Sequence, residues 1–400
     1  MEKALSYFKG DRVIWVITIL MLAFSLVSVY SFIPVLVKVE GGTPIKYLFK
    51  HFIYILISLA VAFWVHRKNP KYVSQLSKFG FYLAIGLLIW AFFTEDVNNA
   101  KRWIRIPFVG LTFQASDFAR LAMVIYVSRL LVKKKNELGD WRSGFLPVVL
   151  PIVIICALIV KDNFSTAAIL FAIGLALLFL GKVPFGKIAA LIGGGVSLLV
   201  LIVLIHLAAP SLNLLPRFDT WQNRIFNRVN DDVNVIENAQ VLNAQDAIYN
   251  GRIDWSIGDD FSLIGGQGVG DGKLKEYLPE AYADFYYSSF VEEFGPISAV
   301  ILVMLYLILL YRIMRIGLRA KDIFYTYVCV GISMLMLSQA CVNMLVCTGI
   351  FPVTGQNMPL LAMGGSAMMM TCLALGIVQA IAIKQTKEEA DDKTEVFETE

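Results

Sequence analysis

Residues 277–296 read YLPEAYADFYYSSFVEEFGP and divide the chain into a polar part and an apolar part. They end the longest polar segment, 210–284, and begin an apolar run. Pro279 is compatible with the first turn of a helix, because proline lacks only an N–H that this turn leaves unpaired. A helix that begins there would place Glu280 and Asp284, four residues apart, on one face.

The sequence predicts different environments for these two carboxylates. Acidic residues in a first helical turn favour the helix dipole, and this is the simpler explanation for Glu280, with a binding role as its alternative. Asp284 is followed by Phe285, Tyr286 and Tyr287, an aromatic group typical of the membrane–water boundary. A carboxylate at that depth is costly unless it has a partner or a chemical task. Asp284 is therefore a candidate functional residue.

Composition assigns the chain to the integral membrane proteins. Of its 400 residues, 58% are hydrophobic and 16% are charged, and the mean hydropathy is +0.67, which is too apolar for a soluble protein. We expect an all-α, polytopic bundle of about ten transmembrane helices in one domain, 1–383, with one long extracytoplasmic loop at 210–284. Apolar runs of spanning length or slightly less lie at 13–35, 47–66, 76–93, 118–132, 144–160, 164–181, 188–209, 286–311, 323–347 and 360–383.

Lysine and arginine are concentrated in alternate connections between these runs, which predicts that those connections and both termini are cytoplasmic. The net charge of +4 reflects this bias and does not indicate nucleic-acid binding. The first apolar run lacks a small-residue cleavage site and is expected to be a retained span. Residues 384–400 are charged and poor in apolar groups, so we expect a disordered cytoplasmic tail.

Two common kinds of site are disfavoured. All five cysteines fall in predicted spans, so no disulfide is expected in the external loops, and no Cys/His spacing suggests a metal site. The glycine run at 265–272 resembles a phosphate loop, but no strand precedes it and no Gly-Lys-Ser/Thr ends it. Flexible backbone that approaches another segment closely is the expected role of these glycines.

Cations surround a tryptophan in the external connection 94–117, where Lys101, Arg102 and Arg105 flank Trp103. One explanation is anchoring, with tryptophan at the headgroup level and arginine on lipid phosphates. The other is an anion site for a phosphorylated lipid, because a guanidinium matches phosphate oxygens. Charge alone does not separate them.

Three further polar segments lie at span boundaries. Asp117 and Arg120 are three residues apart on one helix face and can pair as the span enters the membrane. Residues 161–167, KDNFSTA, predict a short turn followed by a Ser/Thr helix cap. The Pro- and Gly-rich segment 351–359 leads into GGS at 364–366, and this predicts irregular backbone that lines a cavity or is buried in protein.

These segments together resemble the SEDS family (shape, elongation, division and sporulation), the peptidoglycan polymerases that include FtsW and RodA. There are departures: the family's usual Gln-Pro-Ser-Glu reads Gln-Ala-Ser-Asp, with arginine for the following lysine, Asn163 replaces the usual acid, and Ala362-Met363 replaces Ser-Tyr. The blocks AKRWI at 100–104 and NFSTA at 163–167 look more like the FtsW branch than the RodA branch. In the family's order, the matching blocks are AKRWI at 100–104, QASD at 114–117 with Arg120, NFSTA at 163–167, LPEAYADF at 278–285, EEFG at 292–295, and PVTG at 352–355 through GGS at 364–366.

The resemblance implies a glycosyltransferase of the bacterial cytoplasmic membrane, at the division septum, that polymerises lipid II, a disaccharide-pentapeptide on undecaprenyl diphosphate. Asp284 would take the proton of the attacking sugar hydroxyl, and cations would stabilise the diphosphate that leaves in a single inverting displacement. The resemblance implies no particular cofactor, and a divalent cation is compatible with this chemistry. The residues implied to bind the diphosphate or the sugar are Lys101, Arg102, Trp103, Gln114, Ser116, Asp117, Arg120, Glu280, Gly364, Gly365 and Ser366.

The resemblance also implies partners. These are a class B penicillin-binding transpeptidase with a single span, other division proteins and membrane lipids, with no nucleic acid. We expect the transpeptidase helix to dock on 286–311 through small residues, namely Ser288, Ser289, Gly295, Ser298 and Ala299. The alternatives are a flippase or transporter of lipid-linked sugars, for which we find no internal repeat, a RodA-type elongation polymerase, and a non-catalytic scaffold that would tolerate loss of Asp284.

Overall fold

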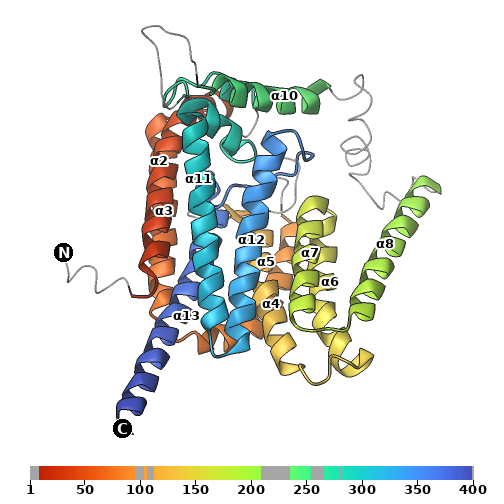
Figure 1. The fold of residues 1–400 in the computed structure, drawn as a ribbon. Coiled ribbons are helices and arrows are strands. Elements are labelled where there is room, and N and C mark those ends of the chain that lie inside the picture. The colour runs from red at the N-terminus through yellow and green to blue at the C-terminus, as the bar shows by residue number, and fades with distance from the viewer. Residues whose placement is uncertain are drawn as a thin grey trace.

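The computed structural model describes residues 9–94, 103–105, 112–208, 235–253, 265–278 and 281–398. Within this part of the chain a helix lies at each predicted span, which confirms the all-α bundle (Figure 1). Eight of these helices are long and apolar enough to cross a membrane, and α7 is a shorter apolar helix. The bundle helices are α2 (Arg12–Glu40), α3 (Pro44–His66), α4 (Lys71–Phe92), α5 (Ala115–Lys133), α6 (Leu146–Val160, preceded by the π-turn Trp141–Phe145), α7 (Phe164–Leu180), α8 (Phe185–Ala208), α11 (Tyr286–Arg319), α12 (Ile323–Cys347) and α13 (Gly365–Glu398).

The bundle has two apolar cores that meet at α5. One core is built mainly by α2, α3, α11, α12 and α13, and the other mainly by α4, α5, α6 and α7. Helix α5 contributes Leu121 and Ile125 to the first core and Met123 and Val124 to the second. Because α5 is enclosed by other helices, it can carry charged side chains that a lipid-facing helix would expose to hydrocarbon.

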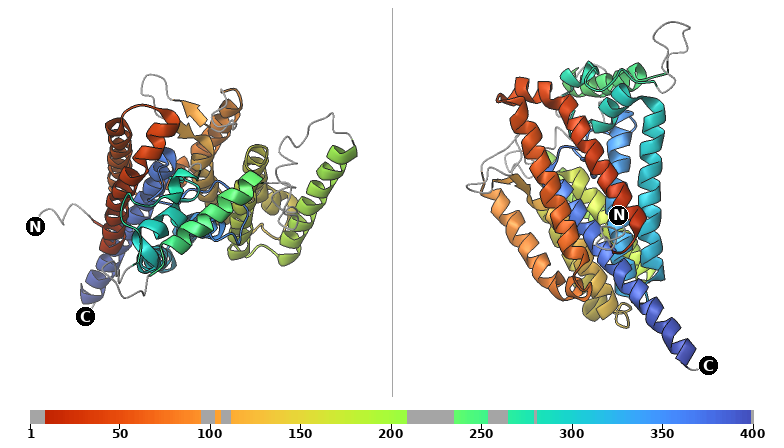
Figure 2. Two further views of the ribbon diagram at one scale, coloured as in Figure 1. Left: turned by 90° about the horizontal axis from the view of Figure 1, so that it is seen from above. Right: turned by 90° about the vertical axis from the view of Figure 1, so that its left-hand side faces the viewer.

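Helix α8 stands apart from the other spans (Figures 1 and 2). Among its side chains only Lys187 and Ile188 are buried, although the helix is apolar along its whole length. A helix that is apolar on every face and lacks protein neighbours suits direct contact with lipid.

The first and last spans meet at one end of the bundle. Asp11, the N-cap of α2, pairs with Arg312 of α11 at 2.5 Å, and its N–H donates to the side chain of Gln379 in α13. At the opposite end, α10 (Val235–Asn250) lies across the bundle and packs on α11 and α12 (Figure 1). A small antiparallel hairpin, β1 (Trp103–Arg105) and β2 (Thr112–Gln114), precedes α5.

Helix α11 is broken near its beginning, and the glycine run repairs the break. Gly295 has a φ of +78°, and the Pro296 that follows has no N–H to donate. The carbonyls of Glu292 and Glu293 accept instead from the N–H groups of Gln267, at 2.8 Å, and Gly268, at 3.0 Å. The predicted close approach of the glycine run is thus confirmed.

A buried ion pair fixes the same loop, which contains the 3₁₀ turn η3 (Leu274–Glu276), to the bundle. Lys275 Nζ lies 2.7 Å from Glu293 Oε1 of α11 and donates to Ser31 Oγ of α2 at 2.6 Å and to the Gly270 carbonyl at 2.9 Å. The two charged side chains are 4% and 3% exposed. This contact holds the loop against two helices.

Two predictions about helix boundaries were wrong. The segment 281–285 forms a turn, and α11 begins only at Tyr286, so Asp284 precedes the helix. At the C-terminus the helix continues through the predicted disordered tail to Glu398. Lysine, glutamate and alanine are strong helix formers, and Lys384 pairs with Glu388 one turn later at 3.4 Å, which supports the extension.

Candidate active site

The predicted pair of Asp117 and Arg120 is confirmed at the start of α5. Arg120 Nη2 lies 2.5 Å from Asp117 Oδ1, and the two side chains are 11% and 3% exposed. Ser366, in the first turn of α13, donates to the other oxygen of Asp117 at 2.8 Å. A buried charge needs several polar partners. The contact between Ser366 of the GGS block and Asp117 of the QASD block supplies one of them.

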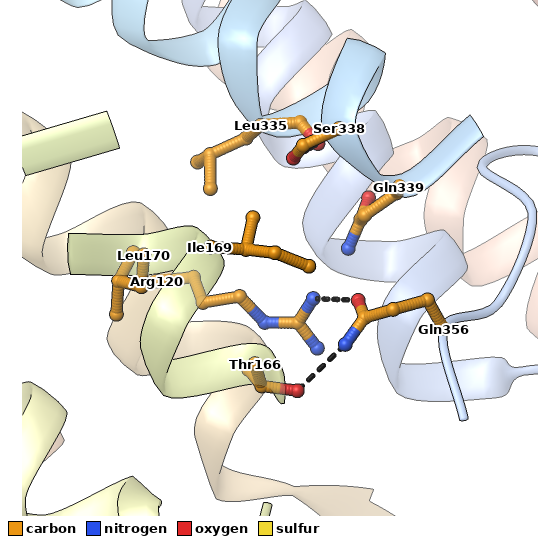
Figure 3. Close-up of a pocket in the computed structure, with 8 residues that line it drawn as sticks. All are labelled: Arg120, Thr166, Ile169, Leu170, Leu335, Ser338, Gln339 and Gln356. Carbon is orange, nitrogen blue, oxygen red and sulfur yellow. Dashed lines mark hydrogen bonds between the residues drawn. The ribbon is translucent and has the colours of Figure 1, made fainter. Parts of the chain in front are cut away.

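Gln356 connects Arg120 to α7. Its Oε1 accepts from Arg120 Nη1 at 3.1 Å, and its Nε2 donates to Thr166 Oγ1 at 2.6 Å (Figure 3). The side chains of Gln356 and Thr166 are buried. The predicted irregular segment therefore supplies a buried polar bridge between two helices.

A small pocket surrounds this bridge. Arg120, Thr166 and Gln356 are its polar side chains on one side, and α12 contributes Ser338 and Gln339 on the other (Figure 3). The pocket is completed by the apolar residues Ile169, Leu170 and Leu335. A buried cation at the wall of a polar pocket can stabilise an anionic group that binds there.

The backbone of Asp284 is tied to the same network. Asn343 of α12 donates from Nδ2 to the Asp284 carbonyl at 2.9 Å and to the Gln356 carbonyl at 2.8 Å. The main chain of Asp284 is therefore joined to Arg120 through Asn343 and Gln356. Asp284 itself is half-buried.

Of the other predicted site residues that the structure describes, Ser116 joins this network through its main chain only. Gln114 ends β2, where it pairs with Trp103, and the Ser116 carbonyl accepts from Arg120 Nε at 3.4 Å. Packing favours glycine at 365, where a Cβ would lie 2.2 Å from the Tyr54 ring. At Gly364 a Cβ would lie 2.6 Å from Nδ2 at the end of the Asn357 side chain, which would have to shift. Lys101, Arg102 and Glu280 lie outside the described residues.

The predicted Ser/Thr cap after 161–163 was wrong. Helix α7 is capped by Asn163, whose side chain accepts from the Thr166 N–H at 2.9 Å. Asn163 also donates to the Thr354 carbonyl at 3.4 Å. The Thr166 hydroxyl does not cap the helix, and its oxygen accepts from Gln356 in the bridge.

The predicted docking face on α11 was also wrong. Ser288, Ser289, Gly295 and Ala299 are buried within the bundle, where their small size allows close packing, and Ser298 is only partly exposed. The exposed face of α11 carries large apolar residues instead: Ile297, Val300, Ile301, Met304, Leu307 and Tyr311.

Sequence reasoning did not single out Thr166, Gln356 or Asn343. Thr166 and Gln356 lie in blocks that the sequence marks as unusual, but their bonding partners are distant in the chain. Asn343 is a polar residue inside an apolar span, and this was the signal that could have identified it. Among the described residues, no three His, Cys, Asp or Glu side chains are grouped as a metal site requires.

Comparison with known proteins places this arrangement in a family. The profile of the family FTSW_RODA_SPOVE, described as "Cell cycle protein", matches residues 11–387. A "Probable peptidoglycan glycosyltransferase FtsW" of Coxiella burnetii is 30% identical, over 93% of this chain and 96% of the relative. One of the same name from Trichlorobacter lovleyi is 28% identical, over 93% of each chain.

Solved structures support the fold. A chain from work described as "Structural coordination of polymerization and crosslinking by a peptidoglycan synthase complex" superposes with a TM-score of 0.70 at 20% identity, over 94% of this chain and 98% of that one. The rod shape determining protein RodA of Thermus thermophilus gives a TM-score of 0.62 at 18% identity, over 93% and 96%. With the family profile covering most of its length and the relatives named FtsW, the chain belongs to the FtsW, RodA and SpoVE family, the SEDS family that its sequence blocks predict, and is FtsW-like.

Proposed function

We propose that this chain is a peptidoglycan glycosyltransferase that polymerises lipid II, with Asp284 as the general base. The names of the relatives that match nearly the whole chain support the reaction class. The observation that carries the site is the hydrogen-bonded path from the Asp284 backbone through Asn343 and Gln356 to Arg120. Segments far apart in the sequence build this path, which joins an acid to a buried cation.

The reaction is a single displacement. A sugar hydroxyl of one lipid-linked chain attacks the anomeric carbon of the other, and its proton passes to the Asp284 carboxylate. The new C–O bond forms as the bond to the diphosphate breaks, and undecaprenyl diphosphate leaves with the electron pair. The configuration at the anomeric carbon inverts, and since diphosphate is a good leaving group, no carboxylic acid is needed to protonate it, in contrast to a glycosidase.

Arg120 is the described cation best arranged for the diphosphate. A guanidinium has five N–H donors, and three have partners, on Asp117, Gln356 and the Ser116 carbonyl. The other two donors have no acceptor among the described residues, and we propose that they bind phosphate oxygens. A fixed cation next to a leaving group stabilises the charge that develops on it.

Lys101 and Arg102 are proposed as further contacts to the diphosphate, and Glu280 as a contact to the sugar. Arg102→Ala is expected to weaken lipid II use more than folding, because the sequence places Arg102 in a polar connection between spans, where a solvated arginine would contribute little to stability. Thermal unfolding and lipid II titration of the purified variant would separate the two effects. A variant that unfolds while lipid II affinity is unchanged would favour the anchoring role.

We further place both termini in the cytoplasm and the Asp284 end of the bundle outside, at the division septum. The meeting of Asp11 with Arg312 and Gln379 supports a common side for both ends, and the lysine and arginine bias supports the cytoplasmic side. Labelling of single introduced cysteines by an impermeant thiol reagent in whole cells would test the orientation. Labelling near Gln385 from outside would contradict it.

A class B penicillin-binding transpeptidase is the proposed partner. The chain superposes on a chain from a peptidoglycan synthase complex, and cross-linking must act on the strand that this site would make. Since the small residues of α11 are mostly buried, a partner that contacts α11 would use the exposed apolar face around Val300 and Met304. Val300→Trp should then lower co-purification of the transpeptidase, and unchanged co-purification would move the contact to another helix.

The deciding experiment is polymerisation of purified lipid II in detergent, with glycan strands resolved on a gel. Wild type should make strands. Asp284→Asn, which keeps the size but cannot act as a base, should lower the rate by about 10²–10⁴-fold. Asp246→Asn, at an exposed acid of α10, is the matched control and should remain active. A chain that moves lipid II across liposomes without making strands would be a flippase, and activity of Asp284→Asn near wild type would remove Asp284 from the base role.

A further inference from the structure

Asn343 occupies an unusual place in the bundle. It lies in the second half of α12, is 1% exposed, and faces the turn that carries Asp284. Its Nδ2 lies 2.8 Å from the Gln356 carbonyl, 2.9 Å from the Asp284 carbonyl and 3.3 Å from the Ala283 carbonyl. Its Oδ1 accepts from the N–H of Tyr287 at 3.3 Å.

One amide therefore satisfies the main chain on both sides of Asp284. The first N–H groups of a helix have no partner within the helix, and Asn343 supplies one for Tyr287 in the first turn of α11. The carbonyls of Ala283 and Asp284 point at the same side chain from the preceding turn. These bonds hold residues 283 and 284 in the turn that precedes α11.

Only an amide fits these partners. Its NH₂ group has two hydrogens to share among the carbonyls, and its oxygen accepts from an N–H. A carboxylate of the same shape would place a negative oxygen against the carbonyl oxygens. An apolar side chain would leave the buried main-chain groups without partners.

We propose that Asn343 is a positioning residue for polymerisation, which fixes the main chain of Asp284 against Gln356 and so sets the base relative to Arg120. This inference rests on the proposed role of Asp284. The alternative is that Asn343 only stabilises the bundle, in which case activity falls in proportion to the folded fraction. A displacement of a reacting group by about 1 Å can lower the rate by about 10²-fold, so the two accounts predict different kinetics.

The test uses the purified full-length chain and three substitutions. Asn343→Leu keeps the approximate volume but removes every hydrogen bond, and Asn343→Asp keeps the shape but removes the donors. Asn343→Gln keeps the amide and moves it outward by one methylene group, so it should fold even where the others do not. Ser333→Ala is the control, because Ser333 is a buried polar residue of α12 whose hydroxyl has no partner among the described contacts.

We expect kcat for lipid II polymerisation per folded molecule to fall by about 10²-fold in Asn343→Leu and Asn343→Asp. It should fall about tenfold in Asn343→Gln, because the amide moves by roughly one bond length while its hydrogen bonds persist. KM for lipid II should change little in all three. Hydrogen exchange should quicken in the peptide that contains Tyr287 in Asn343→Leu, the one variant that removes the oxygen that accepts from the Tyr287 N–H. Ser333→Ala should leave both kinetics and exchange as in wild type.

The proposal is overturned if kcat per folded molecule is unchanged in Asn343→Gln, or if KM alone rises. It is also overturned if hydrogen exchange at Tyr287 stays as in wild type in Asn343→Leu. Combining Asn343→Gln with Asp284→Asn separates this inference from the function on which it rests. No further loss in the combined variant supports an action through Asp284, whereas an active Asp284→Asn single variant refutes the base itself.

Discussion

Two buried ion pairs, Asp117–Arg120 and Lys275–Glu293, are similar in burial. They differ in how many N–H donors of the cation have acceptors among the described residues. An ammonium has three N–H donors, and those of Lys275 have three acceptors in Glu293, Ser31 and the Gly270 carbonyl. Within the described part of the chain, Arg120 has acceptors for three of its five donors, and it lies at the pocket shared by Thr166 and Gln356. Lys275 is therefore saturated by the fold, whereas Arg120 has the donors that our proposal assigns to an anion.

The comparison teaches that burial of a charge does not by itself identify a functional site. Lys275 holds the glycine-containing loop against α2 and α11 beside the break at Gly295. Its role is structural, because all three of its N–H donors are used in hydrogen bonds within the fold. Arg120 joins α5 to Gln356, which in turn bonds Thr166, and it has acceptors for only three donors among the described residues. For this reason we propose Arg120, and not Lys275, for the leaving diphosphate.

The largest expected effect is on the polymerisation rate, when the Asp117–Arg120 pair is changed. The combined variant Asp117→Asn and Arg120→Leu removes both charges, so neither is left buried alone, and it should lower the polymerisation rate by about 10²-fold or more. Arg120→Lys, which restores the residue type usual in the family, should keep most of the activity. Rates are measured on lipid II with equal amounts of folded protein. An active charge-free variant would remove Arg120 from the diphosphate site.

The next effect is on stability, at the other pair. Lys275→Met leaves Glu293 buried without its cation and should lower the free energy of unfolding by about 3–5 kcal/mol. Adding Glu293→Leu should recover much of this loss, because an apolar pair avoids the buried charge. Thermal midpoints in detergent give the order of the three proteins, and the polymerisation rate per folded molecule should stay near wild type. A rate that falls while the midpoint holds would make Lys275 functional.

The glycine loop allows a smaller, matched test. Gly266 and Gly270 both have positive φ, at +85° and +93°, but a Cβ at Gly266 would lie 2.5 Å from the Glu293 carbonyl, whereas one at Gly270 meets nothing within 4 Å. Each alanine costs about 1–2 kcal/mol for the left-handed conformation. Gly266→Ala should lower the thermal midpoint more than Gly270→Ala does, because its Cβ also pushes the loop away from the break in α11. Equal midpoints would mean that the close approach is not required.

The smallest effect is expected at an exposed pair in the same region. Lys38 and Glu276 lie 3.6 Å apart, with side chains 74% and 51% exposed. Lys38→Ala should change stability by less than about 1 kcal/mol, and less at high salt. A midpoint change as large as that of Lys275→Met would show that exposure does not separate these pairs.

The spans were predictable because their apolar runs must cross a bilayer, and the Asp117–Arg120 pair was predictable because it is local in one helix. The partners of Arg120 were not. Gln356 and Asp284 are more than one span away in sequence, and no local pattern indicates that Asn343 joins them. The face of α11 was misjudged because small residues allow close packing either within a bundle or with a partner. Helix α10 was missed because it is polar enough to lie outside the membrane.

The most direct measurement is photo-cross-linking with a lipid II analogue that carries a photoreactive group next to its diphosphate. The purified chain is irradiated with this analogue, digested, and its labelled peptides are identified by mass spectrometry. Label should appear on the peptides that contain Arg120, Thr166 or Gln356, and unmodified lipid II should compete for it. Competed label on the Lys275 loop or around Ser31, with none at the Arg120 pocket, would contradict the assignment of the two ion pairs.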